Sequence, residues 1–213
     1  MAVDAEIYKR MLKELGKDVQ LVAVSKTKTA ADILALYALG QRDFGENYVQ
    51  ELVDKQQQLP SDIRWHFIGH LQSNKVKSIV PFVYLIHGVD SLRLLKEIDR
   101  QAAKTGRVVD VLLQVHIARE ETKFGLDAAE VAELMQAAPA MGAVRVRGLM
   151  GMASNTVDAE AVRAEFRTLR TLLDQWFPGD GILSMGMSGD YRIAIEAGST
   201  MVRIGSLLFG ARG

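Results

Sequence analysis

The chain contains 213 residues, which is enough for one domain with a sizeable buried core. Its 26 Lys and Arg residues balance 26 Asp and Glu residues, so the net charge gives no reason to expect a nucleic acid or an anionic membrane as a partner. The sequence has no Cys, which excludes disulfides, thiol nucleophiles and thiolate metal sites.

No segment of the sequence has the pattern of an export signal or a membrane span. The N-terminus carries Asp4 and Glu6 where a signal peptide would have basic residues followed by an apolar run. The longest apolar runs are far shorter than the roughly 18 to 20 residues that a membrane helix needs. Because no Pro- or Ser-rich linker divides the chain, we expect a cytoplasmic protein with a single domain over residues 1–213.

In chain order, short apolar runs of strand length alternate with segments of helical period. The predicted strands cover residues 19–25, 42–44, 64–68, 83–87, 108–116, 144–150, 182–187 and 201–204. The predicted helices cover residues 4–15, 30–39, 46–59, 73–80, 91–104, 128–138, 158–176 and 191–197. Eight strands separated by helices favour a closed (β/α)8 TIM barrel over an open doubly wound α/β sheet.

Local signals support several helix boundaries. Asp127 followed by Glu130 resembles a capping box, and Ser91 is placed to cap the helix that follows it. The helix over 158–176 has an apolar face that is predicted to pack against the barrel. This face consists of Val162, Phe166, Leu169, Leu173 and Trp176.

In a parallel barrel, chemistry collects at the carboxyl ends of the strands. Lys26 directly follows the first predicted strand. One interpretation is an ordinary surface lysine at a strand end. The other is a lysine that attacks a carbonyl carbon, because an amine in a dry barrel mouth is less solvated and more nucleophilic. Lys26 alone does not decide between these interpretations.

Two short turns that contain Gly and Ser follow the last two predicted strands, at residues 184–190 and 203–206. The loops after these strands form the usual phosphate site of the barrel. A lysine that faces a phosphate site suits either a sugar phosphate in an aldolase or pyridoxal phosphate. Arg203 is placed to contact a pyridine nitrogen, which a guanidinium would keep unprotonated, or to pair with a phosphate or carboxylate.

The four histidines do not predict a metal site. Of His66, His70, His87 and His116, only the first two are near one another, and they straddle a strand end and a turn without an acidic cluster. Five methionines are expected to pack inside the barrel and not to contact a ligand. They are Met141, Met150, Met152, Met185 and Met187.

Seven segments of the sequence resemble the motifs of the pyridoxal phosphate homeostasis proteins. They are AVSKTK (23–28), QRDFGENYVQE (41–51), WHFIG (65–69), LQSNK (71–75), RGLM (147–150), LSMGMS (183–188) and GSTMVRIG (198–205). They occur in the family's order over essentially the whole chain. The resemblance implies a single-domain barrel similar to the N-terminal domain of fold-type III alanine racemase, with pyridoxal 5'-phosphate (PLP) held as an internal aldimine.

The same match carries the family's cofactor-binding residues onto this chain. It implies that Lys26 forms the Schiff base, that Arg203 lies at the pyridine nitrogen and that Asn47 lies beside the ring. Phosphate contacts are implied for the Ser188 side chain and for the backbone of Gly189, Gly205 and Ser206. Positions in the same pocket are implied for His66, Gln72 and Met150. The chain departs from the family at His116, where Asn is common, and at Gly189, where an acid is common.

The resemblance implies a role in PLP (vitamin B6) and amino and keto acid homeostasis, without demonstrated turnover and without catalytic residues. The alternative is a PLP-dependent amino acid racemase. A racemase needs acid–base groups on both faces of the cofactor, and in fold-type III racemases one comes from an additional β domain. Because the sequence ends at Gly213, just after the last predicted strand, we expect that domain to be absent. A third hypothesis is a Schiff-base aldolase for sugar phosphates, for which no acid–base partner is evident.

The expected partners are PLP and, as recipients of the cofactor, PLP-dependent apoenzymes. No nucleic acid, membrane or metal is expected as a partner. The racemase-type dimer depends on the second domain, so we expect a monomer.

Overall fold

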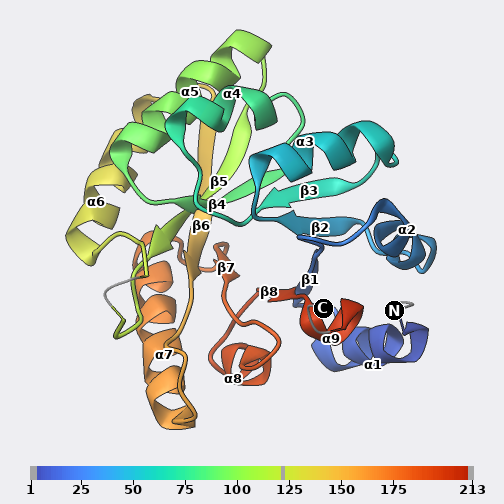
Figure 1. Ribbon diagram of the computed structural model, residues 1–213. Coiled ribbons are helices and arrows are strands. Elements are labelled where there is room, and N and C mark those ends of the chain that lie inside the picture. Colours follow the sequence, from blue (N-terminus) through green and yellow to red (C-terminus); the bar gives the residue numbers. More distant parts are fainter. Residues whose placement is uncertain (1–3, 121–122, 211–213) are drawn as a thin grey trace.

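The structure is a computed structural model that describes residues 4–120 and 123–210. Eight parallel strands form a closed barrel that is surrounded by helices (Figure 1). The strands are β1 (Gln20–Val24), β2 (Asp43–Glu46), β3 (Arg64–Phe67), β4 (Leu85–Val89), β5 (Val109–Val115), β6 (Val144–Gly151), β7 (Ile182–Ser184) and β8 (Met201–Ile204). The α-helices are α1 (Ala5–Leu15), α2 (Ala30–Ala38), α3 (Val49–Gln58), α4 (Val76–Ile79), α5 (Leu92–Thr105), α6 (Ala128–Ala137), α7 (Ala159–Trp176), α8 (Tyr191–Glu196) and α9 (Ser206–Phe209), and the 3₁₀ turns are η1 (Ser73–Lys75) and η2 (Ala138–Ala140).

Each strand pairs in parallel with the next strand in the chain, and β8 closes the barrel against β1. The pairing of β1 with β8 runs from Gln20 opposite Met201 to Ala23 opposite Ile204. Because all strands run in the same direction, their carboxyl ends meet at one mouth of the barrel. The predicted (β/α)8 barrel is confirmed, and the open doubly wound sheet is excluded.

All eight predicted strands are present, but some of their boundaries differ from the prediction. β2 continues to Glu46, so the helix predicted from residue 46 begins at Val49. An acid can end this strand because its side chain is buried with Ser25 as a hydrogen-bond partner. β7 ends at Ser184 and not at residue 187, since Gly186 turns the chain with a φ of +96°.

Three further differences concern short elements. The strand predicted over 83–87 lies two residues later, at Leu85–Val89. The helix predicted over 73–80 is divided into η1 and α4. The last helix, α9, has no counterpart among the predicted elements, because a single turn of four residues is too short to show helical period.

The predicted helix caps are confirmed. Asp127 and Glu130 form a capping box at the start of α6, in which each side chain accepts the other residue's backbone N–H. The Ser91 hydroxyl accepts the N–H of Leu94 at 3.3 Å and caps α5. The predicted apolar face of α7 is buried except for the half-buried Trp176.

The interior of the barrel contains an apolar part and a polar part. The apolar part is a cluster formed by Val22, Leu85, Leu112, Met150 and Met201. The polar part consists of buried Asp43, His66, His87, Ser184 and Arg203. A larger apolar core is made by the outward-facing strand residues and the helices, as expected for strands that are covered on both faces.

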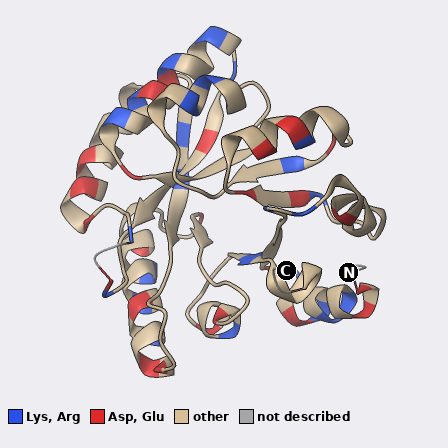
Figure 2. Ribbon diagram, in the orientation of Figure 1, with Lys and Arg blue, Asp and Glu red and all other residues tan. Residues whose placement is uncertain are grey.

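Charged side chains of both signs are interspersed along the outer helices (Figure 2). On α7, for example, Arg170 pairs with Asp174 one turn later. Within the described residues, none of the helices combines the length and the apolar character that a membrane crossing requires.

Candidate cofactor-binding site

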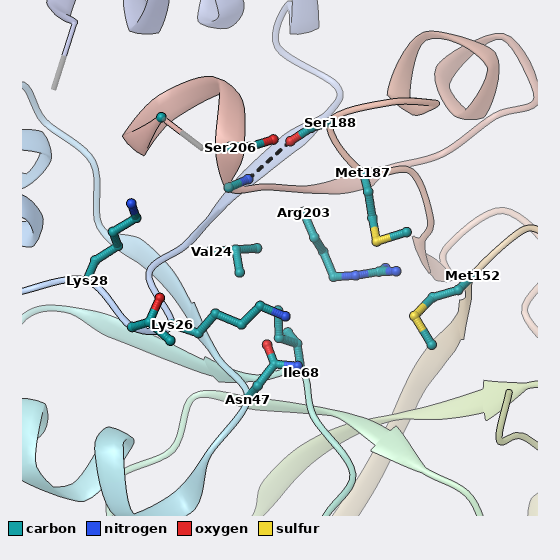
Figure 3. A pocket seen from close by; sticks show the side chains of 13 residues that line it. Val24, Lys26, Lys28, Asn47, Ile68, Met152, Met187, Ser188, Arg203 and Ser206 are labelled. Atoms are coloured by element: carbon teal, nitrogen blue, oxygen red, sulfur yellow. Dashed lines mark hydrogen bonds between the residues drawn. The ribbon is translucent and has the colours of Figure 1, made fainter. Parts of the chain in front are cut away.

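A pocket of about 280 Å³ lies at the mouth of the barrel, where the carboxyl ends of β1, β2 and β8 meet. Figure 3 shows Lys26, Asn47 and Arg203 pointing into it from these three strand ends. The lining residues are Val24, Lys26, Thr27, Lys28, Asn47, Ile68, Met152, Met187, Ser188, Arg203, Gly205, Ser206 and Gly210. The pocket therefore combines residues that are up to 186 positions apart in the sequence (Val24 and Gly210).

The backbone on both sides of Lys26 is held in place. The preceding residue, Ser25, is fully buried, and its hydroxyl donates to Glu46 Oε1 at 2.6 Å. The following residue, Thr27, has a φ of +64°, and its N–H donates to Glu51 Oε1 at 2.5 Å. A non-glycine residue rarely adopts a positive φ unless its surroundings enforce it. The half-buried Lys26 side chain is thus presented by a rigid turn.

A buried ammonium group joins these contacts. Lys55 Nζ donates to the Ser25 carbonyl oxygen at 2.7 Å, to Glu46 Oε1 at 2.7 Å and to Glu51 Oε1 at 2.6 Å. These three bonds use all the N–H groups of an ammonium. Burial raises the pKa of the Glu46 carboxyl, and the nearby Lys55 charge opposes that shift. The sequence interpretation missed Lys55, although Glu51 and Lys55 stand four residues apart on α3, the spacing of a helical ion pair.

The opposite wall of the pocket is formed by the turns after β7 and β8. The N–H of Gly205 lies 3.4 Å from the Ser188 hydroxyl oxygen, and Ser206 follows it at the start of α9 (Figure 3). The preceding turn is tight, because a Cβ at Gly186 would lie 2.6 Å from the Ala194 Cβ. As predicted from the two Gly- and Ser-containing turns, small polar residues and backbone N–H groups gather here.

Arg203 is the buried cation of the site. Its guanidinium donates to the carbonyl oxygen and the hydroxyl oxygen of Ser184, both at 2.8 Å, and to the carbonyl oxygen of Gly151 at 3.1 Å. Burial lowers the pKa of Arg203 to about 10, and the charge of Asp190 opposes this shift. The group therefore remains protonated at neutral pH.

Asn47 stands directly after β2 at the edge of the pocket. Its side-chain oxygen is buried and has no hydrogen-bond partner among the described residues, so it is available to a bound molecule. Its backbone is fixed by Gly69, because a Cβ at Gly69 would lie 2.3 Å from the Asn47 carbonyl oxygen.

Four of the predicted site residues lie outside this set of lining residues. His66 and Met150 are fully buried inside the barrel. Gly189 is exposed in the turn after Ser188, and Gln72 is exposed beside a neighbouring hollow that Asn47 also lines. Their contacts with a cofactor stay predictions.

Two methionines that were expected to pack in the interior line the pocket, although one of them, Met152, also packs against the apolar cluster inside the barrel. Met187 is 39% exposed, and the half-buried Met152 lies across the pocket from Lys26 (Figure 3). Both follow the ends of strands, which places their side chains at the mouth of the barrel. Met150 and Met185 are buried as predicted.

Two of the four histidines make separate contacts, and the other two contact each other. His70 is exposed and pairs with Asp90 at 3.0 Å, whereas His116 Nε2 lies 2.9 Å from the Glu120 carbonyl oxygen. His66 and His87 are in contact inside the barrel. Among residues 4–120 and 123–210 there is no group of three or more side chains that could bind a metal ion.

Comparison with known proteins places this barrel in a family. The profile of the family "Alanine racemase, N-terminal domain" matches residues 5–213. A pyridoxal phosphate homeostasis protein of Vibrio alginolyticus is 44% identical over 204 residues, which cover 92% of this chain and 88% of that protein. The Escherichia coli K12 protein of the same name is 41% identical over 206 residues, covering 92% and 87%. The chain belongs to the pyridoxal phosphate homeostasis protein family.

Solved structures give the same placement. PipY of Synechococcus elongatus, determined without PLP, is 40% identical and superimposes with a TM-score of 0.91 over 97% of this chain and 99% of that one. The PipY structure with PLP bound has a TM-score of 0.88 with the same identity and coverage. The alanine racemase of Clostridium difficile 630 is only 14% identical, with a TM-score of 0.78 over 97% of this chain and 56% of that chain. It therefore supports the fold alone.

Proposed function

We propose that this protein binds PLP in the pocket, with Lys26 as the point of covalent attachment, and acts in cytoplasmic PLP and amino and keto acid homeostasis without catalysing turnover. The proposal rests on the arrangement of one pocket. Three of its sides present the amine of Lys26, the turns that carry Ser188 and Gly205, and the buried guanidinium of Arg203. The relative whose structure contains PLP supports the same assignment.

The donor set of the pocket fits the phosphate of PLP. The Ser188 hydroxyl, the Gly205 N–H and the Ser206 residue lie on one wall, and no side chain at Gly205 keeps a phosphate away from the backbone. Small donors of this kind can approach phosphate oxygens closely. We assign this wall to the phosphate group.

The remaining polar residues fit the ring of PLP. When bound, PLP supplies an aldehyde that condenses with an amine, with loss of water, and a pyridine ring that withdraws electrons. Lys26 provides the amine, and Asn47, whose side-chain oxygen has no partner among the described residues, lines the same pocket (Figure 3). Arg203 retains its own proton and therefore does not protonate a ring nitrogen beside it. This arrangement holds the cofactor while weakening its capacity to accept electrons.

The pocket offers little for acid–base catalysis. Among the described lining residues, the ionisable side chains are Lys26, Lys28 and Arg203, and Asp, Glu, His and Tyr are absent from this set. A racemase would need a proton donor and acceptor on both faces of the bound amino acid. The composition of the pocket supports storage and exchange of PLP over turnover, and we expect a monomer that passes PLP to PLP-dependent apoenzymes.

The proposal is tested by the absorption spectrum of the purified protein before and after borohydride reduction, followed by peptide mass mapping. We expect a yellow protein that borohydride bleaches, with the pyridoxyl mass on Lys26. Lys26→Ala should lose the covalent adduct but retain some PLP through the phosphate wall. Lys28→Ala is the matched control, because Lys28 lines the same pocket but donates to the Phe209 carbonyl oxygen at 3.1 Å. Its adduct on Lys26 should be preserved.

Each part of the proposal has its own contrary result. A colourless protein that PLP cannot reconstitute would contradict the cofactor and favour a sugar phosphate ligand. An adduct at a lysine other than Lys26 would contradict the attachment site. Steady racemisation of alanine that is abolished by Lys26→Ala would contradict the absence of turnover and favour the racemase alternative.

A further inference from the structure

We propose that His66 and His87 are positioning residues for Arg203. Together with Asp43 and Ser184 they form a hydrogen-bonded chain that crosses the barrel interior and fixes the guanidinium in the pocket wall. The effect on the cofactor rests on the function proposed above, whereas the chain itself is a property of the protein alone.

The chain is continuous from the amino end of the barrel to the pocket. Asp43 Oδ1 lies 2.9 Å from His66 Nε2, and His66 Nδ1 lies 3.0 Å from His87 Nε2. His87 Nδ1 lies 3.0 Å from the Ser184 hydroxyl oxygen, which in turn lies 2.8 Å from Arg203 NH1. All five residues are at least 95% buried.

The chemistry of the groups determines the direction of every bond in this chain. Hydrogen bonds from Arg64 and His66 outweigh the effect of burial and lower the pKa of Asp43 to about 2, so this carboxylate only accepts. Burial lowers the pKa of His66, and it holds the pKa of His87 well below its usual range. Two imidazoles in contact inside a barrel are thus both neutral, and each has one donor and one acceptor nitrogen.

The bonds can then be followed from one end to the other. His66 donates from Nε2 to Asp43, which leaves its Nδ1 to accept from Nε2 of His87. The Nδ1 of His87 therefore accepts the hydroxyl proton of Ser184. Since that proton is committed to His87, the lone pairs of the Ser184 oxygen are available to the guanidinium of Arg203. Both imidazoles carry their proton on Nε2.

The outcome is a fixed orientation of Arg203. Three of its donor contacts go to Ser184 and Gly151, which are not among the residues that line the pocket. Of these contacts, only the one to the Ser184 hydroxyl can change its geometry, because a serine hydroxyl rotates to suit its neighbours. His87 removes this freedom, and His66 removes the corresponding choice of tautomer at His87.

Packing alone does not require this polarity. The same barrel interior contains an apolar cluster around Leu112, so hydrocarbon side chains fit the space. Burying imidazoles and a hydroxyl costs free energy unless every polar atom finds a partner, and a satisfied network specifies one arrangement. The hydrogen-bonded chain ends at Arg203, which is the one buried cation among the described residues that line the pocket. A network with a single arrangement holds this guanidinium in one orientation.

The test uses three variants. His87→Phe keeps a ring of similar size but removes both nitrogens, and His87→Gln keeps one donor and one acceptor. His70→Phe is the matched control, because His70 is exposed, pairs with Asp90 and lies outside the chain. Circular dichroism establishes that each variant is folded.

The first measurement needs no cofactor. Side-chain ¹⁵N NMR of the wild-type protein should show neutral His66 and His87 with the proton on Nε2, and slow exchange of the Arg203 N–H groups with water. We expect His87→Phe to accelerate this exchange about tenfold or more, as for the loss of a hydrogen bond to a charged group. His87→Gln should recover most of the protection, and His70→Phe should resemble the wild type.

The second measurement is PLP binding. We expect His87→Phe to raise the dissociation constant of PLP about tenfold and to shift the absorption band of the bound cofactor, with recovery in His87→Gln. A folded His87→Phe protein with wild-type Arg203 exchange, affinity and spectrum would overturn the positioning role.

The outcomes for the two proposals are separable. If the wild-type protein does not bind PLP, the proposed function fails, but the exchange of the Arg203 N–H groups still decides the positioning role. If His87→Phe does not fold, Ser184→Ala removes the hydroxyl between His87 and Arg203 and should accelerate the same exchange. Unchanged exchange in Ser184→Ala would then overturn the inference.

Discussion

Glu51 accepts the backbone N–H of Thr27 at 2.5 Å and thereby links helix α3 to the turn that carries the pocket lysine. Thr27 has a φ of +64°, a conformation that costs an L-amino acid about 1 to 2 kcal/mol. Strained residues persist where the surroundings determine them, and they gather at functional sites. The direction of Lys26 is therefore set by a helix that does not itself line the pocket.

Glu51→Ala should loosen this turn. The change removes the acceptor of Thr27 and one of the two carboxylates that compensate the buried Lys55. We expect the free energy of unfolding, measured by urea denaturation, to fall by about 1 to 3 kcal/mol, and the PLP adduct on Lys26 to form more slowly. Glu160→Ala, which removes an exposed carboxylate on α7, is the control and should change neither value. Equal behaviour of the two variants would contradict the role of Glu51.

Gly69→Ala should disturb the pocket through Asn47. An added Cβ would lie 2.3 Å from the Asn47 carbonyl oxygen, so backbone must move. We expect a loss of about 1 to 3 kcal/mol in unfolding free energy, as for other overpacked sites, together with weaker PLP binding. Gly142→Ala is the control, because nothing lies within 4 Å of its added Cβ. An unchanged unfolding free energy in Gly69→Ala would show that the segments that carry Gly69 and Asn47 can move apart at little cost in stability.

The sequence was sufficient to predict the barrel and several of the residues that line the pocket at its mouth. Lys26, Ser188 and Arg203 each follow or end a short apolar run, and in a parallel barrel the ends of all strands converge whatever the register. The prediction therefore needed only the period of the strands. The exposed Met187 was misinterpreted because apolar residues after a strand end look like continued strand.

The contacts beneath the mouth were not predictable in the same way. The bond between His87 and Ser184 joins residues 97 positions apart, and it depends on which alternate residues of β4 and β7 face inward. A single-residue change of register would separate them. The sequence did contain a signal, since His66 and His87 each interrupt an apolar strand with a polar side chain.

Ser188→Ala should weaken PLP binding without preventing covalent attachment. The hydroxyl lies on the wall that we assign to the phosphate, 3.4 Å from the Gly205 nitrogen. Loss of one hydrogen bond to an anionic group raises the dissociation constant about tenfold. Titration followed at the cofactor absorption band measures this change, with the exposed Ser61→Ala as control. Wild-type affinity of Ser188→Ala for PLP would contradict the assignment of the phosphate group to this wall.

The buried histidines make the stability of the fold depend on pH. Burial lowers the pKa of His66 and holds that of His87 well below the usual value, so both stay neutral in the folded protein while they take up protons in the unfolded chain below about pH 6.5. The unfolded state then binds more protons, and stability falls as the pH falls. The raised pKa of Glu46 acts in the opposite sense, since its contribution is lost as the pH rises from about 4.5.

We therefore expect the unfolding free energy to decrease below pH 6.5 with a slope that approaches about 1.4 kcal/mol per pH unit for each buried histidine. Urea denaturation between pH 7.5 and about pH 5 measures this slope. His87→Gln removes one titrating group and should reduce the slope by about half, whereas His70→Gln, at an exposed position, should leave the histidine-dependent slope unchanged. A constant free energy over this range in the wild-type protein would mean that the imidazoles take up protons in the folded protein, and it would contradict the assignment of His66 and His87 as neutral donors and acceptors.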